Sequence, residues 1–217
     1  MQHPKFISFE GIDGSGKTTQ AKRLAKTLQH LGFSVHLLRE PGNTPVSEHI
    51  RSLLLDRSTY HLTPKTELLL FSASRSQLVD TVIQPLLERG DVVICDRFTD
   101  SSIAYQAFGR KLPLEMVQQC NRIATNDLQP ILTFYLRIPL EIAQQRMQQT
   151  RNTQDRFEAS KTEFYQRVIE GYEFLVQTEP DRVFAIDATQ PVDQIAAEIW
   201  TILQQRLPWL AQHSTSS

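Results

Sequence analysis

Residues 11–18 read Gly-Ile-Asp-Gly-Ser-Gly-Lys-Thr, and this stretch decides the fold. It matches the pattern G-x-x-x-x-G-K-[S/T], in which glycines allow successive backbone N–H groups to turn toward a phosphate. An apolar run at residues 6–9 precedes it, and a helical pattern with Ala21, Leu24 and Leu28 on one face follows it. This strand, loop and helix are the context that a phosphate-binding loop requires, whereas an ordinary glycine-rich turn needs neither neighbour.

The chemistry of this loop follows from its residue types. A helix that begins at the loop directs its N-terminal dipole at the phosphates. Lys17 is placed to reach the β- and γ-phosphates, and the Thr18 hydroxyl is placed to bind Mg²⁺. The predicted ATP-binding residues are Gly11, Ile12, Asp13, Gly14, Ser15, Gly16, Lys17, Thr18 and Thr19.

The loop alone indicates only a nucleoside triphosphate, because motor ATPases, GTPases and small-molecule kinases share it. A GTPase is disfavoured, since the chain contains no Asn-Lys-x-Asp motif for reading a guanine base. A motor ATPase is disfavoured by the length of 217 residues. A kinase that acts on a small molecule remains the best interpretation of the loop.

Composition excludes several other classes. The chain is 40% hydrophobic and 22% charged with a net charge of −1, so we expect one folded domain spanning residues 1–217. There is no overall basic excess of the kind that nucleic-acid binders carry. No apolar run approaches the roughly 18 residues of a membrane span, and we expect no signal peptide and no membrane partner. Cys95 and Cys120 are expected to be reduced thiols of a cytoplasmic protein, and the histidine spacing does not favour a zinc site.

Glycine usage is low and concentrated. Only 8 of the 217 residues are glycine, about half of the roughly 7% found in average proteins. Gly11, Gly14 and Gly16 nevertheless fall together in the loop. This concentration predicts a special backbone conformation there.

Apolar runs alternate with helical patterns along the whole chain. We predict strands at residues 6–9, 35–38, 92–95, 131–136 and 183–186. Helices are expected between them, with Thr44-Pro45 and Thr63-Pro64 as start signals and a bend at Pro85 in a long helix from Thr63 to Arg89. Strands that alternate with helices indicate an α/β domain with a five-stranded parallel sheet covered on both faces. The tail at residues 213–217 is expected to fray.

Charged residues follow two of the predicted strands. Asp96 and Arg97 end the third strand, and Arg39 ends the second. The carboxyl edge of a parallel sheet is where ligands bind. We therefore predict Asp96 as a ligand of Mg²⁺ or its waters and the two arginines as anion-binding groups. A structural ion pair at the strand ends is the alternative for each.

Two further sets of residues have an ordinary and a functional interpretation. Phe71 and Arg75 lie four apart on a predicted helix and share a face. They are either core residues or a plate and a donor for a nucleobase. Arg146, Arg151 and Arg156 lie in a polar stretch. They either form a solvated face or belong to a mobile lid, about residues 146–157, that closes over the transferring phosphoryl group.

Taken together, these motifs resemble thymidylate kinases. The resemblance rests on the phosphate loop and on stretches that follow it along the chain, which are Arg39-Glu40-Pro41-Gly42, Ile50 to Leu55, Asp96-Arg97-Phe98, Ala104-Tyr105-Gln106, Asp155-Arg156 and Ile186-Asp187-Ala188. It covers about residues 5–203. It implies a P-loop nucleoside monophosphate kinase that transfers the γ-phosphoryl group of ATP to dTMP with Mg²⁺, and it suggests a homodimer.

The resemblance also implies roles for individual residues. Phe71 would stack on the thymine and Arg75 would donate to its edge, with Ser102 and Gln106 near the base. Arg39 and Arg97 would hold the acceptor phosphate, and Tyr105 would press on the sugar where a ribonucleotide carries its 2′-hydroxyl. The catalytic set that follows is Lys17, Asp13, Arg97, Arg146, Arg151 and Arg156. Another nucleotide or deoxynucleoside kinase, or a nucleotide-binding regulator without turnover, remains an alternative.

Two details separate this chain from some members of that family. Some thymidylate kinases carry an arginine within the loop, at positions that are Gly14 and Ser15 here, so this chain resembles the bacterial type with lid arginines. The family often has a second glycine where Asn43 follows Gly42. Asparagine tolerates a left-handed backbone better than other non-glycine residues do, so we expect the turn to be preserved.

Overall fold

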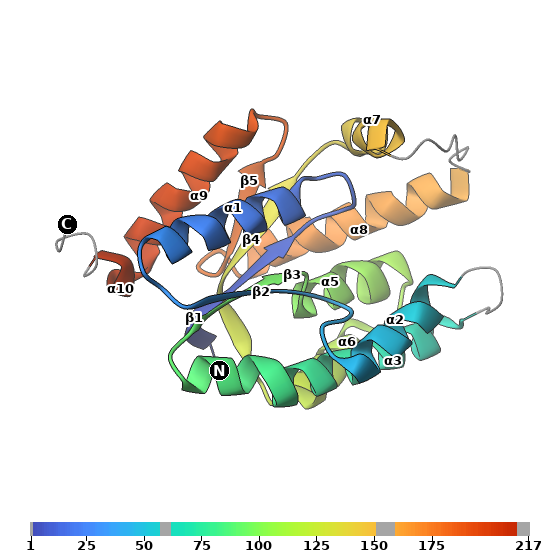
Figure 1. Ribbon diagram of the computed structural model, residues 1–217. Coiled ribbons are helices and arrows are strands. Elements are labelled where there is room, and N and C mark those ends of the chain that lie inside the picture. The colour runs from blue at the N-terminus through green and yellow to red at the C-terminus, as the bar shows by residue number, and fades with distance from the viewer. Residues whose placement is uncertain (1, 57–61, 151–158, 212–217) are drawn as a thin grey trace.

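The computed structural model describes residues 2–56, 62–150 and 159–211. Its centre is a parallel sheet of five strands in the order β2-β3-β1-β4-β5 (Figure 1). The strands are β1 (Gln2–Glu10), β2 (Val35–Arg39), β3 (Val92–Asp96), β4 (Gln129–Arg137) and β5 (Val183–Asp187). All five predicted strands and their parallel arrangement are therefore confirmed.

Helices connect successive strands and cover both faces of the sheet (Figure 1). The first connections are α1 (Lys17–His30), α2 (Pro45–Leu55), α3 (Pro64–Leu78), the π-helix η1 (Val79–Ile83) and α4 (Gln84–Glu88). The later ones are α5 (Thr99–Ser102), the π-helix η2 (Ile103–Gly109), α6 (Leu114–Thr125), α7 (Leu140–Thr150), α8 (Ala159–Thr178), α9 (Val192–Arg206) and α10 (Pro208–Ala211). None of the described helices is both long and apolar enough to cross a membrane.

The predicted helix start signals have the expected geometry. The Thr44 hydroxyl accepts a hydrogen bond from the Ser47 backbone N–H at 3.0 Å, and Pro45 occupies the first turn of α2. The Thr63 hydroxyl likewise accepts a hydrogen bond from the Thr66 backbone N–H, and Pro64 is the first residue of α3. Each cap satisfies a backbone donor that the first turn of the helix leaves free.

The long helix predicted for residues 63–89 is interrupted one turn earlier than expected. The irregularity falls at η1, where the backbone widens to π-type turns just before Pro85. A proline ring clashes with the carbonyl group four residues before it, here that of Thr81, and it cannot donate a backbone hydrogen bond. A wider turn at that point accommodates both effects without ending the helix.

Side chains of each central strand alternate between two hydrophobic layers. Ile7 and Ile94 face the layer that contains α1 and α9, whereas Phe6 and Cys95 face η1 and α4. All four side chains are fully buried. Because both faces of the sheet are covered, polar groups that act on a ligand are expected at the ends of the strands.

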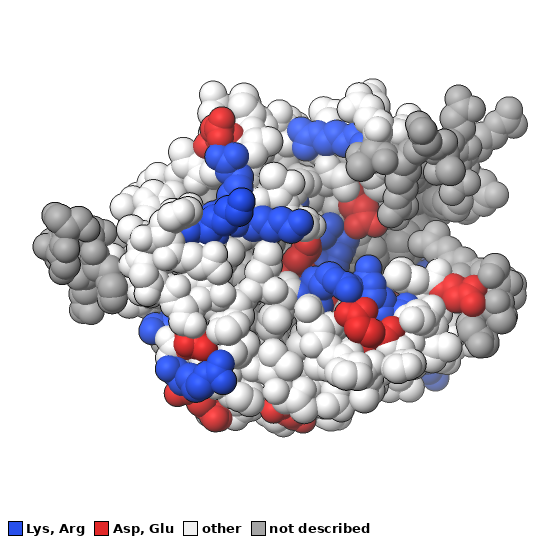
Figure 2. Space-filling view, viewed as in Figure 1, with Lys and Arg blue, Asp and Glu red and all other residues white. Residues whose placement is uncertain are grey.

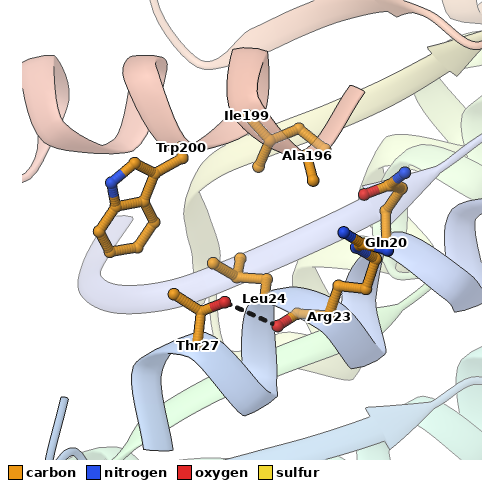
Figure 3. Close-up of a pocket in the computed structure, with 7 residues that line it drawn as sticks. All are labelled: Gln20, Arg23, Leu24, Thr27, Ala196, Ile199 and Trp200. Carbon is orange, nitrogen blue, oxygen red and sulfur yellow. Dashed lines mark hydrogen bonds between the residues drawn. The ribbon is translucent and has the colours of Figure 1, made fainter. Parts of the chain in front are cut away.

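A shallow cavity of about 100 Å³ lies between α1 and α9 (Figure 3). Leu24 and Thr27 of α1 face Ile199 and Trp200 of α9 across it. Pockets that hold nucleotides or drug-sized ligands occupy roughly 300–1,000 Å³. This cavity is therefore a packing gap between two helices and not the nucleotide site.

A buried ionic network ties the segment after β3 to the far side of the sheet. The Arg182 guanidinium donates to both carboxylate oxygens of Asp100, at 2.7 and 2.8 Å. The Thr133 hydroxyl donates to Asp100 at 2.9 Å and lies 2.7 Å from the Ser8 hydroxyl. Asp100 and Arg182 are only 2% and 3% exposed, so their charges depend on partners within the protein, and Arg182 also donates to Glu179 at 2.7 Å.

We predict that Asp100→Asn lowers the free energy of unfolding by about 1–3 kcal/mol, because it removes the carboxylate that accepts two of the Arg182 hydrogen bonds and leaves Glu179 as the remaining carboxylate partner of that buried charge. Urea unfolding of both proteins measures the difference. Asp181→Asn is the matched control, since the Asp181 side chain is 96% exposed and its carboxylate lies 3.8 Å from Arg206. Exposed pairs of this kind add little stability. Equal effects of the two substitutions would contradict the structural role of the network.

Candidate active site

The predicted phosphate loop has a backbone conformation that requires glycine at three positions. Gly11, Gly14 and Gly16 have φ values of 142°, 83° and 91°, all in the region that side chains disfavour. Gly14 has a second constraint, because a Cβ atom there would lie 2.4 Å from the Ala143 carbonyl oxygen of α7. The loop is therefore shaped by its own torsion angles and by the close approach of a distant helix.

Lys17 and Arg97 both contact the carboxylate of Asp13, which is a residue of this loop. The Lys17 ammonium lies 3.4 Å from Asp13 Oδ1, and the Arg97 guanidinium lies 2.8 Å from the same oxygen. Burial would raise the pKa of Asp13, but Arg97 and Lys17 hold that pKa well below its ordinary value. Burial and the Arg97 charge lower the pKa of Lys17. Asp13 thus joins the end of the phosphate loop to the end of β3.

Thr18 and Asp96, the two residues predicted to bind Mg²⁺, lie in contact with each other. The Thr18 hydroxyl donates to Asp96 Oδ2, while Asp96 Oδ1 is buried without a hydrogen-bond partner among the described residues. One hydroxyl and one carboxylate with a spare oxygen are a suitable ligand set for Mg²⁺, which keeps water and phosphate ligands for its other positions. No cluster of three or more His, Cys, Asp or Glu side chains that could hold a metal ion occurs in the described part of the chain.

Arg97 is held in an unusual backbone conformation. Its φ is 76°, and its backbone N–H donates to the Phe9 carbonyl oxygen at 3.0 Å. Its guanidinium donates to the Tyr105 hydroxyl at 3.2 Å and lies 5.0 Å above that ring. A left-handed non-glycine residue is strained, and such residues occur where a site requires one side-chain direction.

The carboxylate of Glu10 holds the segment that carries Arg97. It accepts hydrogen bonds from the Phe98 backbone N–H at 2.6 Å, the Ser101 hydroxyl at 2.5 Å and the Tyr172 hydroxyl at 2.9 Å. Both hydroxyls also accept from the Arg97 guanidinium, at 3.2 and 3.4 Å. Glu10 is fully buried, and burial together with the Asp100 charge raises its pKa to about 7.

The end of β2 supplies a second group of cations. Arg39 donates to both oxygens of Glu48 at 3.0 and 3.2 Å and to the Pro41 carbonyl, and Arg51 donates to the same carbonyl at 2.9 Å. Asn43 adopts a φ of 71°, as predicted, and its side-chain oxygen accepts from the Arg39 backbone N–H at 2.6 Å. The guanidinium groups of Arg39 at the end of β2 and of Arg51 on α2 therefore meet at the carbonyl of Pro41, in the turn that follows β2.

Arg75 is more deeply buried than a typical ligand-binding arginine. It is 1% exposed and donates four hydrogen bonds, to Glu40, Ser102, Asn121 and the Phe98 carbonyl, at 2.8 to 3.1 Å. A guanidinium has five N–H groups, so one is not used by these four contacts. The rigid anchoring fixes the direction of that remaining donor.

Phe71 lies one helical turn before Arg75 on the same face of α3. It is partly exposed, and among the described residues it belongs to neither of the two buried hydrophobic clusters. The core interpretation is therefore less favourable than the sequence alone suggested. Ser102 and Gln106, which lie opposite on α5 and η2, are both buried.

The lid prediction falls only partly within the described structure. Arg146 of α7 donates to the Ala188 carbonyl oxygen at 3.0 Å, which places it beside the loop that follows β5. Arg151 and Arg156 lie outside the described residues. Their assignment as lid arginines, like the catalytic role of Arg146, therefore stays a prediction.

Figure 2 shows basic and acidic side chains gathered around a hollow between the α1 side and the α2–α3 side of the molecule. Lys17 and Thr18 begin α1 after the loop that follows β1, Arg39 ends β2, and Arg51 belongs to α2. Arg97 follows β3, which lies between β2 and β1 in the sheet, and it contacts Asp13. The fold and this arrangement define a P-loop kinase site, with groups for a donor triphosphate and for an anionic acceptor.

Comparisons with known proteins narrow this class. The thymidylate kinase family profile matches residues 9–199. The thymidylate kinase of Lactobacillus acidophilus is 45% identical over 94% of this chain and 95% of its own length, and that of Syntrophotalea carbinolica is 43% identical over 90% and 93%. The crystal structure of thymidylate kinase from Ehrlichia chaffeensis superposes with a TM-score of 0.73 at 33% identity, covering 91% of this chain and 97% of that one. This chain belongs to the thymidylate kinase family.

Several residues that organise the site were not predicted from the sequence. Glu10 had a detectable signal, because it is a charged residue at the end of an otherwise apolar strand. Ser101 and Tyr172 had none, since they lie 91 and 162 positions from Glu10 in the chain. The helical segment from Thr99 to Gly109, which carries Ser101, Ser102, Tyr105 and Gln106, was also not predicted.

Glu10 makes stability depend on pH in a definite direction. Its pKa is raised to about 7 in the folded protein from 4.5, so between these values the folded state retains a proton that the unfolded state has lost. The free energy of unfolding should therefore fall as pH rises from about 5 to 7, by up to about 1.4 kcal/mol per pH unit from this group.

Glu10→Gln should remove this component of the slope, which urea unfolding at a series of pH values measures. Glu88→Gln, at an exposed position on α4, is the control and should keep the wild-type slope. Parallel curves for wild type and Glu10→Gln would contradict the raised pKa.

Proposed function

We propose that this protein transfers the γ-phosphoryl group of ATP to the phosphate of dTMP, giving dTDP and ADP. The observation that carries the proposal is that Lys17 and Arg97 reach the same oxygen of Asp13, at 3.4 and 2.8 Å. The donor-phosphate cation and the acceptor-phosphate cation therefore lie within the reach of one small side chain. Family membership supplies the identity of the acceptor.

In this mechanism the residues of the chain position two anions and neutralise their charge. The phosphate loop and Lys17 hold the β- and γ-phosphates, while Arg97 and Arg39 hold the dTMP phosphate. An oxygen of that phosphate forms a bond to the γ-phosphorus as the bond from phosphorus to the β-phosphate oxygen breaks. Most of the catalytic effect of such an arrangement comes from positioning and from charge stabilisation.

Asp13 lies at the midpoint of this arrangement and pairs with both cations. Bound phosphates would compete with its carboxylate for Lys17 and Arg97. We infer that Asp13 keeps the two side chains in place before the nucleotides arrive. Mg²⁺ held by Thr18 and Asp96 would neutralise charge on the phosphates of the donor.

The base and sugar of the acceptor would lie between α3 and α5–η2. Phe71 offers a ring face, and the remaining N–H of Arg75 offers a donor toward a keto oxygen. Tyr105 is fixed by the Arg97 contact at 3.2 Å and by an edge contact with Phe164 at 6.1 Å. A rigid ring at the sugar would reject an added 2′-hydroxyl by overlap.

We further propose that Arg146, Arg151 and Arg156 form a lid over the transferring group, that the protein is a homodimer, and that it is cytoplasmic. The dimer is supported by exposed apolar side chains on α2, α3 and α6, which include Leu55, Leu69 and Ile123 at 58%, 60% and 80% exposure. Apolar side chains that form a contiguous exposed patch are typical of an interface between subunits, and these three residues are candidates for such a patch. The two free cysteines agree with a reducing compartment.

The substrate is tested by ADP release with ATP, Mg²⁺ and a panel of acceptors. We expect dTMP to have the highest kcat/KM among dTMP, dUMP, UMP, CMP and AMP. A different best acceptor would show another nucleotide kinase. Single-turnover measurements that yield no dTDP would instead favour a regulator without catalysis.

Lys17→Ala should reduce kcat by at least about 10³-fold, because it removes a charge that stabilises the transferring phosphoryl group. Circular dichroism should show an unchanged fold. Lys22→Ala is the control, since Lys22 is an exposed residue of the same helix α1. Full activity in Lys17→Ala would refute the mechanism.

A further inference from the structure

Two pairs of hydrogen-bonded side chains connect α3 to α5 and η2. Arg75 donates to the Ser102 hydroxyl at 3.0 Å, and Gln106 Nε2 donates to Glu67 Oε1 at 2.8 Å. Glu67, Phe71 and Arg75 follow one another at intervals of four residues on α3, so they share one face of that helix. Phe71 therefore lies between the two pairs, at the level where a base stacked on it would meet both Arg75 and Gln106.

Glu67 is itself held firmly from the other side. The Arg110 guanidinium donates to Glu67 Oε1 at 3.2 Å and to Oε2 at 2.9 Å. Arg110 in turn lies 4.7 Å above the Phe164 ring. A forked guanidinium contact of this kind fixes the plane of the carboxylate. The Glu67 side chain is only 16% exposed, so solvent competes little for these bonds.

The contact with Glu67 determines which end of the Gln106 amide faces the base. An ionised carboxylate accepts hydrogen bonds and cannot donate them, so the amide atom turned toward Glu67 must be the NH₂ group. The carbonyl oxygen of Gln106 is then turned away from Glu67. No described residue donates a hydrogen bond to this oxygen, although Gln106 is only 2% exposed.

We propose that Glu67 is a specificity-determining positioning residue, which orients Gln106 as a hydrogen-bond acceptor toward a pyrimidine that carries N3–H. This inference rests on the proposed function and identifies how its base site distinguishes pyrimidines. Thymine and uracil have a donor at N3 and a keto oxygen beside it. Cytosine has an acceptor at N3 and an amino group beside it, which opposes both Gln106 and Arg75.

Arg75 cannot provide the whole distinction between thymine and cytosine, although the direction of its guanidinium is fixed. An amide has nearly the same shape after a half-turn that exchanges its oxygen and nitrogen. A free Gln106 could therefore make this half-turn and donate to N3 of cytosine. Glu67 prevents the half-turn, because it would bring two acceptor oxygens together in a buried contact.

The test uses Glu67→Gln, whose side chain can either donate or accept and so releases the Gln106 amide. We expect the ratio of kcat/KM for dTMP to that for dCMP to fall about tenfold. The ratio for dTMP and dUMP should not change, because these bases present the same hydrogen-bonding edge. A general loosening of the site would not separate the two ratios in this way.

Glu163→Gln is the matched control. Glu163 is a 75% exposed glutamate on α8, and it lies 4.0 Å from Arg167 without contacting Gln106. It should leave both ratios at the wild-type value. If Glu67→Gln unfolds at a markedly lower temperature, Glu67→Ala provides a second route, since it also removes the carboxylate that accepts from the Gln106 amide. That variant should lower the dTMP to dCMP ratio in the same direction.

The outcomes separate this inference from the proposed function. A wild-type protein that prefers dTMP, with an unchanged dTMP to dCMP ratio in a folded Glu67→Gln or Glu67→Ala variant, would overturn the role of Glu67 and leave the function standing. A wild-type protein without a preference for dTMP would overturn the proposed function as well. A selective loss of discrimination against dCMP would support both.

Discussion

The contacts of Asp13 with Lys17 and Arg97 connect the phosphate loop to the segment that follows β3. Lys17 begins the helix after β1, and Arg97 follows β3, so the contact depends on these strands being neighbours in the sheet. Asp13 satisfies two cations that would otherwise repel each other in a partly buried place. The sheet order, the strained backbone of Arg97 and the Glu10 network all serve to bring these charges to one point.

The support behind this point is arranged in layers. Glu10, at the end of β1, accepts hydrogen bonds from Phe98 and Ser101 in the segment after β3 and from Tyr172 of α8. Arg182 holds Asp100 in the same segment from the far side of the sheet. A short segment is thus fixed by contacts from several elements, which is how a site maintains a geometry that its own torsion angles oppose.

The sequence predicted the parts of the structure that local patterns determine. The loop, the five strands and the two threonine caps depend on neighbouring residues, and so does the left-handed turn at Asn43. The segment from Thr99 to Gly109 was missed because its π-helical turns depend on packing against α8. The burial of Arg75 was also not foreseen, since its partners Glu40, Ser102 and Asn121 come from three distant parts of the chain.

The contact between Gly14 and the Ala143 carbonyl oxygen has an evolutionary consequence. In this chain any side chain at position 14 would collide with the backbone of α7, and backbone cannot rotate aside as a side chain can. An arginine could enter the loop there only after α7 had moved. Position 14 can therefore gain a side chain only together with a displacement of this helix, which a single codon change does not supply.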